Sequence, residues 1–430
     1  MKKVLLIIVV LALPSLVDAQ KLVTLKECYE KAAEVNSLAG EKSSYSDISS
    51  LKDQNLVKGW LPTLDANGTF LYNSSVIDMG SALGAIPIPG IADLIKPLPH
   101  EQYKVTIDIN QMIYDGGAVK NARAVEKADL AVNEKQTETD LYKLRSQINT
   151  YFFNILLLGR QKEILQNYLS LLDKRLATIQ SAVDNGILLK SDLDVISAEK
   201  IKLSQQLEEN EILKAALLKV LAEITGQDFG NSAELVLPAF PDELNSDISR
   251  PELDLFDLRK QQLDAGLNLI SSKRMPKAFG FATLGYGNPP GNNFFKDEFA
   301  PYYILGAGVK WNIFDWNKAA NEKQVIRLQQ NILENRKKDL SDNLKRLLEI
   351  KRPEIKSIDA LIATDTELVA LRKRISASAE SQYNNGTITA TELMNEMTSE
   401  RLALINSELH KVSLALAQVE YYNISGQNIE

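Results

Sequence analysis

The sequence predicts a mainly helical protein with a small amount of membrane β structure, built twice from one unit. Three observations support this fold class. The chain of 430 residues starts with a secretory leader, it repeats itself at a nearly fixed spacing, and each repeat contains two alternating segments followed by very long helical stretches. With 45% hydrophobic and 24% charged residues, the chain has enough apolar material for a core, which excludes a disordered protein.

Charge and residue usage exclude several functions. The formal net charge is -7, which opposes the binding of nucleic acid by bulk electrostatics. The single cysteine, Cys28, excludes an intrachain disulfide, and His100 and His410 are too few for a histidine-built metal site. The sequence shows no Ser-His-Asp set, Gly-rich phosphate loop or CxxC motif. We therefore expect no enzyme activity, no cofactor and no bound metal.

The first segment, residues 1–19, has the pattern of a signal peptide. Lys2-Lys3 precede an apolar run from Val4 to Leu13, and Val17-Asp18-Ala19 lead to a cleavage site after Ala19. The run is too short for a membrane-spanning helix, which needs about 20 apolar residues. No later stretch is long enough either, so a membrane segment of the mature chain would have to consist of strands.

The mature chain contains two copies of one unit. A shift of 200 residues aligns Ile113-Tyr114-Asp115 with Ile313-Phe314-Asp315, and Asn185-Gly186 with Asn385-Gly386. Upstream the shift becomes 214 residues, because the first copy carries a longer, proline-rich loop within 74–101. We assign the first repeat to 20–235, a linker to 236–249 and the second repeat to 250–430.

Each copy begins with a helical pattern and continues with two strands. In the first copy, apolar residues recur at helical spacing from Leu25 to Ala32, and in the second the pattern starts at Pro251, which suits a first helical turn. Apolar and polar residues then alternate with a period of two, as in half-buried strands. The predicted strands cover about 62–73 and 102–114 in the first copy, and 276–287 and 301–314 in the second.

Very long helices follow each strand pair. We expect them at about 117–184 and 190–225 in the first copy, and at about 317–383 and 390–424 in the second. A helix of some 65 residues spans roughly 100 Å, which is too long for a compact globule. The Asn-Gly pairs reverse the chain, so each long helix has an antiparallel partner. Pro353, inside the second long helix, predicts a kink or a break.

Four strands of about ten residues are long enough to cross a bilayer but too few to close a barrel. Because an open sheet edge is not tolerated in lipid, other chains must complete the barrel. Two chains would give eight strands and three would give twelve. A barrel of eight strands is filled by side chains, whereas one of twelve leaves a lumen, so a conducting protein favours three chains.

Local sequences add to the duplicated order of elements. They are Leu22–Ala33 at the start, Leu61-Pro62-Thr63-Leu64 before a strand, Gln111–Gly117 after a strand, and Arg250-Pro251-Glu252-Leu253 at the second copy. In these features the chain resembles the TolC-like outer-membrane efflux protein family, also called outer membrane factors. The resemblance implies a homotrimer in which a twelve-stranded β-barrel in the outer membrane continues into a periplasmic α-helical barrel.

The resemblance also implies a function and partners. Such a protein is the passive exit duct of a tripartite efflux pump or a type I secretion system. Its partners would be a periplasmic adaptor, or membrane fusion protein, an inner-membrane RND or ABC transporter, and outer-membrane lipid. Because the transporter selects the cargo, drug, metal and protein cannot be distinguished as substrates from this sequence.

The resemblance places candidate gate residues beside the two glycine turns, which are expected at the tunnel mouth. In the family, an acidic residue six positions after each turn glycine constricts the closed end, and a tyrosine three positions before the second glycine bonds to the first acid. Asp192, Glu392 and Tyr383 match these positions. Asn395 stands in place of a further aspartate and Ile388 in place of a gate arginine, so this gate carries less charge. Solvated residues at a plain helix turn are the alternative.

The two turns are apolar for segments expected to face water. Exposed apolar groups at a loop tip predict a partner surface, which by resemblance is the helical hairpin of the adaptor. Contacts within the trimer are the alternative. The predicted tip comprises Gly186, Ile187, Leu188, Leu189, Gly386, Ile388 and Thr389.

Two methionines near the expected mouth raise a separate hypothesis. Met394 and Met397 lie three residues apart, and thioethers can bind Cu(I) or Ag(I). Gap-filling in a helical core is the more common role of methionine.

Two other functions compete with the duct. A periplasmic coiled-coil scaffold or adaptor without a barrel would explain the helices, but the four amphipathic strands oppose it. A hydrolase would need a nucleophile and a base that the sequence does not show.

Overall fold

The computed structural model describes residues 22–77, 98–230, 234–240, 244, 247–293 and 296–428. The signal peptide predicted at 1–19 lies outside these residues, as does most of the loop predicted within 74–101. The chain forms two compact units, and both repeats contribute to each. Among the described residues, the first unit contains 22–39, 140–250 and 341–428, and the second contains 40–139 and 251–340.

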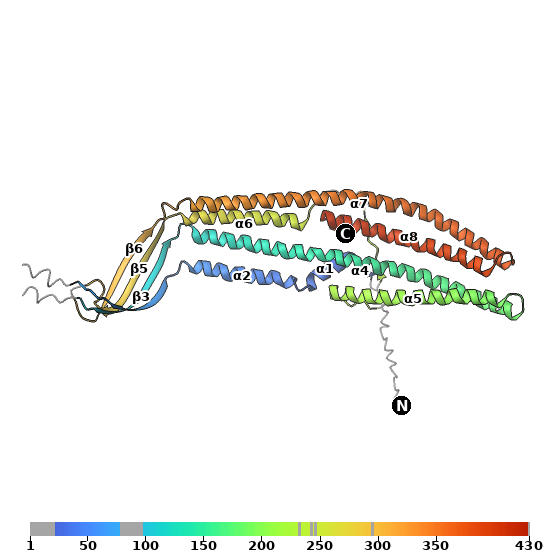
Figure 1. Cartoon of the computed structure of the whole chain (residues 1–430), viewed down its shortest axis with the longest axis horizontal. Coiled ribbons are helices and arrows are strands. Elements are labelled where there is room, and N and C mark those ends of the chain that lie inside the picture. Colours follow the sequence, from blue (N-terminus) through green and yellow to red (C-terminus); the bar gives the residue numbers. More distant parts are fainter. Residues whose placement is uncertain are drawn as a thin grey trace, which may run out of the picture. The chain divides into compact units, whose positions relative to one another are not determined.

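The second unit contains a four-stranded antiparallel sheet in the order β2-β3-β5-β6, of which Figure 1 labels the last three side by side. The two predicted strand pairs are joined through β3 and β5. β2 and β6 form the edges, and within the described residues neither edge has a further partner strand. The strands are β2 (Thr63–Tyr72), β3 (Glu101–Tyr114), β5 (Lys277–Asn288) and β6 (Ala300–Lys310).

One face of this sheet is apolar and exposed. The register places Leu64, Ile109, Ala282 and Leu305 in one row across the four strands. Leu64 is 68% exposed and Leu305 is 72% exposed. Such side chains would be buried if the sheet had a protein core on this side, so the apolar face needs an apolar environment from elsewhere.

The opposite face is polar on β2 and β3 and aromatic on β5 and β6. The carboxylate of Asp108 accepts hydrogen bonds from Asn67 Nδ2 at 2.7 Å, Thr106 Oγ1 at 3.0 Å and Thr283 Oγ1 at 2.6 Å. On β5, the ring of Phe281 covers Gly306 of the neighbouring strand, and a Cβ at this glycine would lie 2.4 Å from the ring. Phe279 covers Gly308 in the same way, so the two phenylalanines that interrupt the apolar alternation of β5 fill the space above glycines.

β6 ends at Lys310, short of the limit of 314 predicted from the sequence. Its partner β5 begins at Lys277, which pairs with Lys310, so residues after Lys310 have no strand beside them. In the first repeat, β3 continues to Tyr114 because it pairs with Ala278 after a bulge. The difference between the repeats therefore follows from the position of β6 at the sheet edge.

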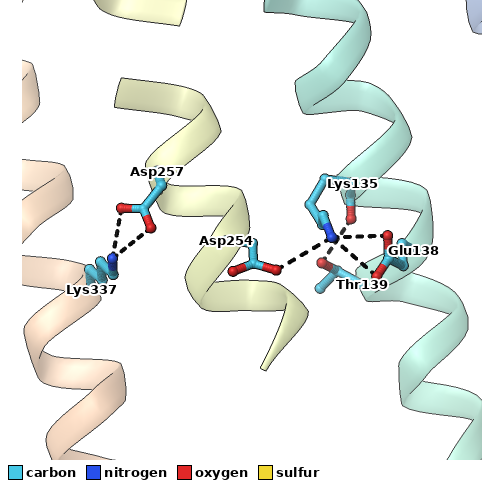
Figure 2. A network of polar contacts seen from close by, with 6 residues as sticks. All are labelled: Lys135, Glu138, Thr139, Asp254, Asp257 and Lys337. Carbon is cyan, nitrogen blue, oxygen red and sulfur yellow. Dashed lines mark hydrogen bonds and ion pairs between the residues drawn. The ribbon is translucent and has the colours of Figure 1, made fainter. Parts of the chain in front are cut away.

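Four helical segments of the second unit follow the order of the strands. They are α2 (Ala39–Lys58), the start of α4 (Ala118–Asp184), α6 (Pro251–Lys273) and the start of α7 (Lys318–Asn384). Ion pairs join α2 to α4 (Arg123–Asp53, 2.6 Å), α4 to α6 (Lys135–Asp254, 3.4 Å) and α6 to α7 (Lys337–Asp257, 2.7 Å); Figure 2 shows the last two. Ion pairs of this kind contribute little stability individually, but they show which helices are neighbours. Within the described residues, no helix is both long and apolar enough to span a membrane.

The first unit has a hydrophobic core around a short parallel pairing of β1 (Leu22–Val23) with β4 (Glu234–Leu235). The helix α1 (Leu25–Val35) follows β1, and Thr24 caps it by accepting a hydrogen bond from Glu27 N. Cys28 is fully buried in this core. Its surroundings match the structural role of a small apolar residue.

Two helical hairpins complete the first unit. The end of α4 turns into α5 (Lys190–Thr225), and the end of α7 turns into α8 (Ala390–Ser425) (Figure 1). α4 and α7 both have 67 residues, and α5 and α8 both have 36, which explains why one shift of 200 residues holds through the helices. A second hydrophobic cluster contains residues of all four helices: Leu165, Tyr168, Leu172, Ile179, Ile196, Leu203, Ala379, Tyr383, Ala390, Leu393, Met394 and Met397.

The break predicted at Pro353 does not occur, because α7 is continuous from Lys318 to Asn384. Leu348 and Ile355, on either side of the proline, pack with Tyr421 of α8 in one cluster. Lys351 also forms an ion pair with Glu420 of α8 at 2.6 Å. Contacts with α8 therefore hold the turns before and after Pro353 in register.

Candidate functional site

The two hairpin turns, 185–189 and 385–389, have the same backbone geometry. Gly186 and Gly386 have φ angles of +73° and +71°, in the left-handed region that residues with a Cβ avoid. The N–H of each glycine donates to a carbonyl three residues earlier, Val183 O at 2.9 Å and Tyr383 O at 3.0 Å. A Cβ at either glycine would meet open space, so only the backbone conformation requires glycine here.

The predicted gate acids cap the helices that follow the turns. Glu392 Oε2 accepts from Thr389 N at 2.8 Å, while Thr389 Oγ1 accepts from Glu392 N at 3.2 Å, which completes a capping box. Asp192 Oδ2 accepts from Leu189 N at 3.3 Å, but Leu189 has no side-chain acceptor to return the bond. Hydrogen bonds from Thr389 lower the pKa of the Glu392 carboxyl; the bond from the backbone N–H has the larger effect and the bond from the hydroxyl the smaller one. Both acids thus stabilise the turn itself.

Tyr383 lies in the core beneath the turns. Its side chain is buried, and among the described residues its hydroxyl has no hydrogen-bond partner. Burial raises the pKa of Tyr383, the negative charge of Asp192 raises it further, and Arg175 opposes the shift. Arg175 is itself paired with Glu380 at 2.7 Å. The structure thus brings Tyr383 and Asp192 close enough for electrostatic interaction, without a hydrogen bond between them in the single chain.

The two turns differ in what they expose. Ile187 is 76% exposed and Leu189 is 71% exposed, whereas the equivalent positions of the second turn carry Thr387 and Thr389. Leu188 and Ile388, the middle residues of Ile187-Leu188-Leu189 and Thr387-Ile388-Thr389, pack against the hydrophobic cluster of the hairpins. Asn395 is exposed on α8. An exposed apolar tip is therefore present only on the first hairpin.

Met394 and Met397 belong to the hydrophobic cluster and are 6% and 4% exposed. In the part of the chain that the structure describes, no group of three or more His, Cys, Asp or Glu side chains could hold a metal ion. Both methionines pack among the apolar side chains of this cluster.

Arg401 is a buried charge that sequence reasoning missed. It lies on α8 with only 4% of its surface exposed and pairs with Glu199 of α5 at 3.3 Å. In the sequence, Glu400-Arg401 reads as part of a solvated helix face. Comparison with the first repeat would have found the anomaly, since Ile201 occupies the equivalent position.

No protein-family model and no curated protein matches this sequence. Solved structures match over 94% of the chain. One is CusC, described in connection with folding and transmembrane channel formation, with 11% identity, 92% of that chain covered and a TM-score of 0.67. Others are the Campylobacter jejuni CmeC outer membrane channel (14%, 86%, 0.64) and the Vibrio cholerae outer membrane protein VceC (13%, 97%, 0.64).

These similarities confirm the predicted fold for the single chain. They extend over both repeats, and they include proteins described as outer membrane channels. The chain has the TolC-like fold of outer membrane factors.

Proposed function

We propose that this protein is an outer-membrane exit duct, through which an inner-membrane transporter and a periplasmic adaptor expel substrates. One observation carries the proposal: the sheet exposes an apolar face and two unpaired edges in a chain with the fold of outer membrane channels. An exposed apolar sheet face is costly in water but favourable in lipid, and an unpaired edge in lipid must find a partner.

A second copy of the chain is the natural partner for the sheet edges. β6 of one copy would pair with β2 of the next, and three copies would close a barrel of twelve strands. The apolar row through Leu64 and Leu305 would then face lipid. The polar and aromatic face, with Asp108 and Phe281, would line the lumen. The hairpins would extend into the periplasm as a helical barrel.

The proposal includes no catalysis and no cofactor. Service to an efflux pump and service to a type I secretion system both fit it, because a duct encloses whatever its transporter delivers. The runner-up is a periplasmic scaffold without a barrel, and it makes the opposite prediction about membrane association.

The first test is the mass of the protein extracted in detergent from outer membranes, measured by light scattering with correction for bound detergent. Three mature chains would have a mass of roughly 140 kDa once the signal peptide is removed. That mass would support the shared barrel. A monomer that stays soluble without detergent would refute the duct and favour the scaffold.

The gate is tested by conductance in planar bilayers. We expect Tyr383→Phe combined with Asp192→Ala to loosen the closed end and raise the conductance. Because Asp192 also caps α5, Asp192→Asn is the matched control, since it removes the charge and keeps an acceptor for Leu189 N–H. Unchanged conductance in the double variant would remove these residues from the gate.

The adaptor surface is tested on the first turn. Ile187→Thr with Leu189→Thr reproduces the polar pattern of the second turn without changing the half-buried Leu188. We expect this variant to keep its thermal stability and to lose adaptor binding by at least about tenfold. Equal binding of the variant and the wild type would show that the adaptor docks elsewhere.

A further inference from the structure

At one equivalent position of the two repeats, the charged residue is buried and the apolar residue is exposed. On α8, Arg401 is 4% exposed, whereas on α5 the equivalent Ile201 is 61% exposed. Hydration of the guanidinium and burial of the isoleucine would both favour the reverse arrangement. The stability of the single chain therefore does not explain the arginine on α8.

The surroundings of Arg401 satisfy only part of its hydrogen-bonding capacity. Nη2 donates to Glu199 Oε1 at 3.3 Å, but among the described residues Nε and Nη1 are buried without a partner. Asn210 of α5, also buried, has an unpartnered side-chain oxygen. Leu172, Leu203 and Met397 line a narrow cavity beside the guanidinium together with Tyr168 and Thr398. Arg401 also lines a second, open cavity, which has both apolar and polar side chains in its wall, among them Gln161 and Glu209. Burial lowers the pKa of Arg401, and Glu199 opposes the shift.

This arrangement makes closure between the two hairpins costly. A buried guanidinium keeps its charge, and each N–H without a partner loses its hydrogen bonds to water. Buried ion pairs with incomplete hydrogen bonding are often no more stable than apolar side chains of similar volume. An apolar residue at 401 would have joined the surrounding cluster of leucines and methionines at no such cost.

Separation of the two hairpins would remove this free-energy penalty. Arg401 belongs to the α7–α8 hairpin, and its ion-pair partner Glu199 belongs to the α4–α5 hairpin. A displacement of α8 from α5 would return both charges, and the side chain of Asn210, to water. The exposed ion pair of Arg372 with Glu396 (3.4 Å) lies within the α7–α8 hairpin, so it would not be released by this movement.

We propose that Arg401 is a positioning residue for opening of the duct, because its uncompensated burial lowers the free-energy difference between the closed and the open arrangement of the two hairpins. The inference rests on the proposed function and adds a residue outside the predicted gate. It assigns to the buried arginine a role opposite to that of a latch, since its removal should favour the closed arrangement.

The experiment uses the full-length trimer with Arg401→Met, Arg401→Leu and Glu199→Gln, and with Arg372→Met as the matched control. Tip separation is measured by spin-label distances from Thr387→Cys, an exposed position, after Cys28→Ser has removed the one native cysteine. Channel activity is measured in planar bilayers on the same variants without the label.

For Arg401→Met and Arg401→Leu we expect shorter tip distances, a higher melting temperature and an open-to-closed ratio about tenfold lower, which corresponds to about 1.4 kcal/mol. Glu199→Gln, which removes the negative charge beside the arginine but keeps a hydrogen-bond acceptor, should shift all three quantities in the opposite direction. Arg372→Met should leave the tip distances unchanged.

A latch role would be revealed by longer tip distances and higher conductance in Arg401→Met, and this outcome would overturn the inference. A purely structural role, also a refutation, would change the melting temperature in every Arg401 variant while tip distances stay the same. If the wild type forms no channel, the proposed function fails, but the tip distances still test the effect of Arg401 on the hairpins.

Discussion

Gly426, just after α8, packs closely against the chain at Ser249 and Arg250, and a substitution there tests this contact. Gly426 has a φ angle of +82°, and a Cβ at this position would lie 2.3 Å from Ser249 O and 2.8 Å from Arg250 N. These are backbone atoms at the junction of the linker and the second repeat. Ser249 N donates to Ser425 O at 2.7 Å, and Arg250 Nη1 donates to Asn423 O at 2.6 Å. Gly426→Ala must therefore displace the chain at Ser249.

The expected magnitude is the sum of two costs. An alanine in the left-handed conformation costs roughly 1–2 kcal/mol. Loss of the Ser249–Ser425 hydrogen bond adds about 1 kcal/mol. We therefore expect Gly426→Ala to destabilise the protein by about 2–3 kcal/mol. Gly386→Ala is the matched control, because it has a similar φ and open space around the added methyl group, so only the first cost applies.

Unfolding of the detergent-solubilised protein would be followed by circular dichroism at increasing denaturant. Gly426→Ala should shift the midpoint roughly 1.5 to 2 times as far as Gly386→Ala. Equal shifts would refute the reasoning, since they would mean that the chain at Ser249 can move away at no cost.

Three further predictions follow from particular contacts. Gly306→Val should disrupt β6, because a Cβ there meets the ring of Phe281 at 2.4 Å, whereas Gly68→Val in β2 should be tolerated in its open surroundings; the yields of folded, detergent-extracted protein compare the two. Leu393→Ala, at a fully buried position, should cost roughly 2–5 kcal/mol in unfolding experiments, and Leu402→Ala, at a 52% exposed position, much less. Glu392 has a lowered pKa in the folded protein, so its cap contributes stability above the unfolded carboxyl pKa and loses it as pH falls through the folded pKa. The stability difference between wild type and Glu392→Gln should therefore shrink below about pH 4, and a difference independent of pH would contradict the cap.

Much of the fold is readable from the sequence because its patterns are long. The alternation of apolar residues at 102–114 matches the observed β3, and the shift of 200 residues relates helices of equal length. The pairing of β3 with β5 is not encoded in either strand alone, because it joins segments from different repeats. Of the kink or break predicted at Pro353, the break does not occur, since contacts with α8 hold the helix together on both sides of the proline.

The site is less readable than the fold, because one side chain can serve two purposes. Asp192 and Glu392 stand at positions that a gate and a helix cap both favour, and the cap becomes visible only with the backbone N–H groups in place. Arg401 looks like a solvated charge until its neighbours on α4 and α5 are known. The difference in exposure between Ile187 and Leu188 likewise depends on the hairpin core.

The shared order of strands and helices in the second unit has a geometric consequence. Neighbouring strands are about 4.8 Å apart, and with a tilt of about 45° each would take up about 7 Å of a barrel's circumference, whereas packed helices are about 8–10 Å apart. A barrel wall in which strands and helices keep the same order of neighbours must therefore widen where the strands become helices. The turns at this junction have unusual backbones, with positive φ at Gly116 and Gly117 in one repeat and at Trp316 and Asn317 in the other. In the proposed duct, we expect these four residues to determine the diameter at the junction, where the sheet meets a wider ring of helices.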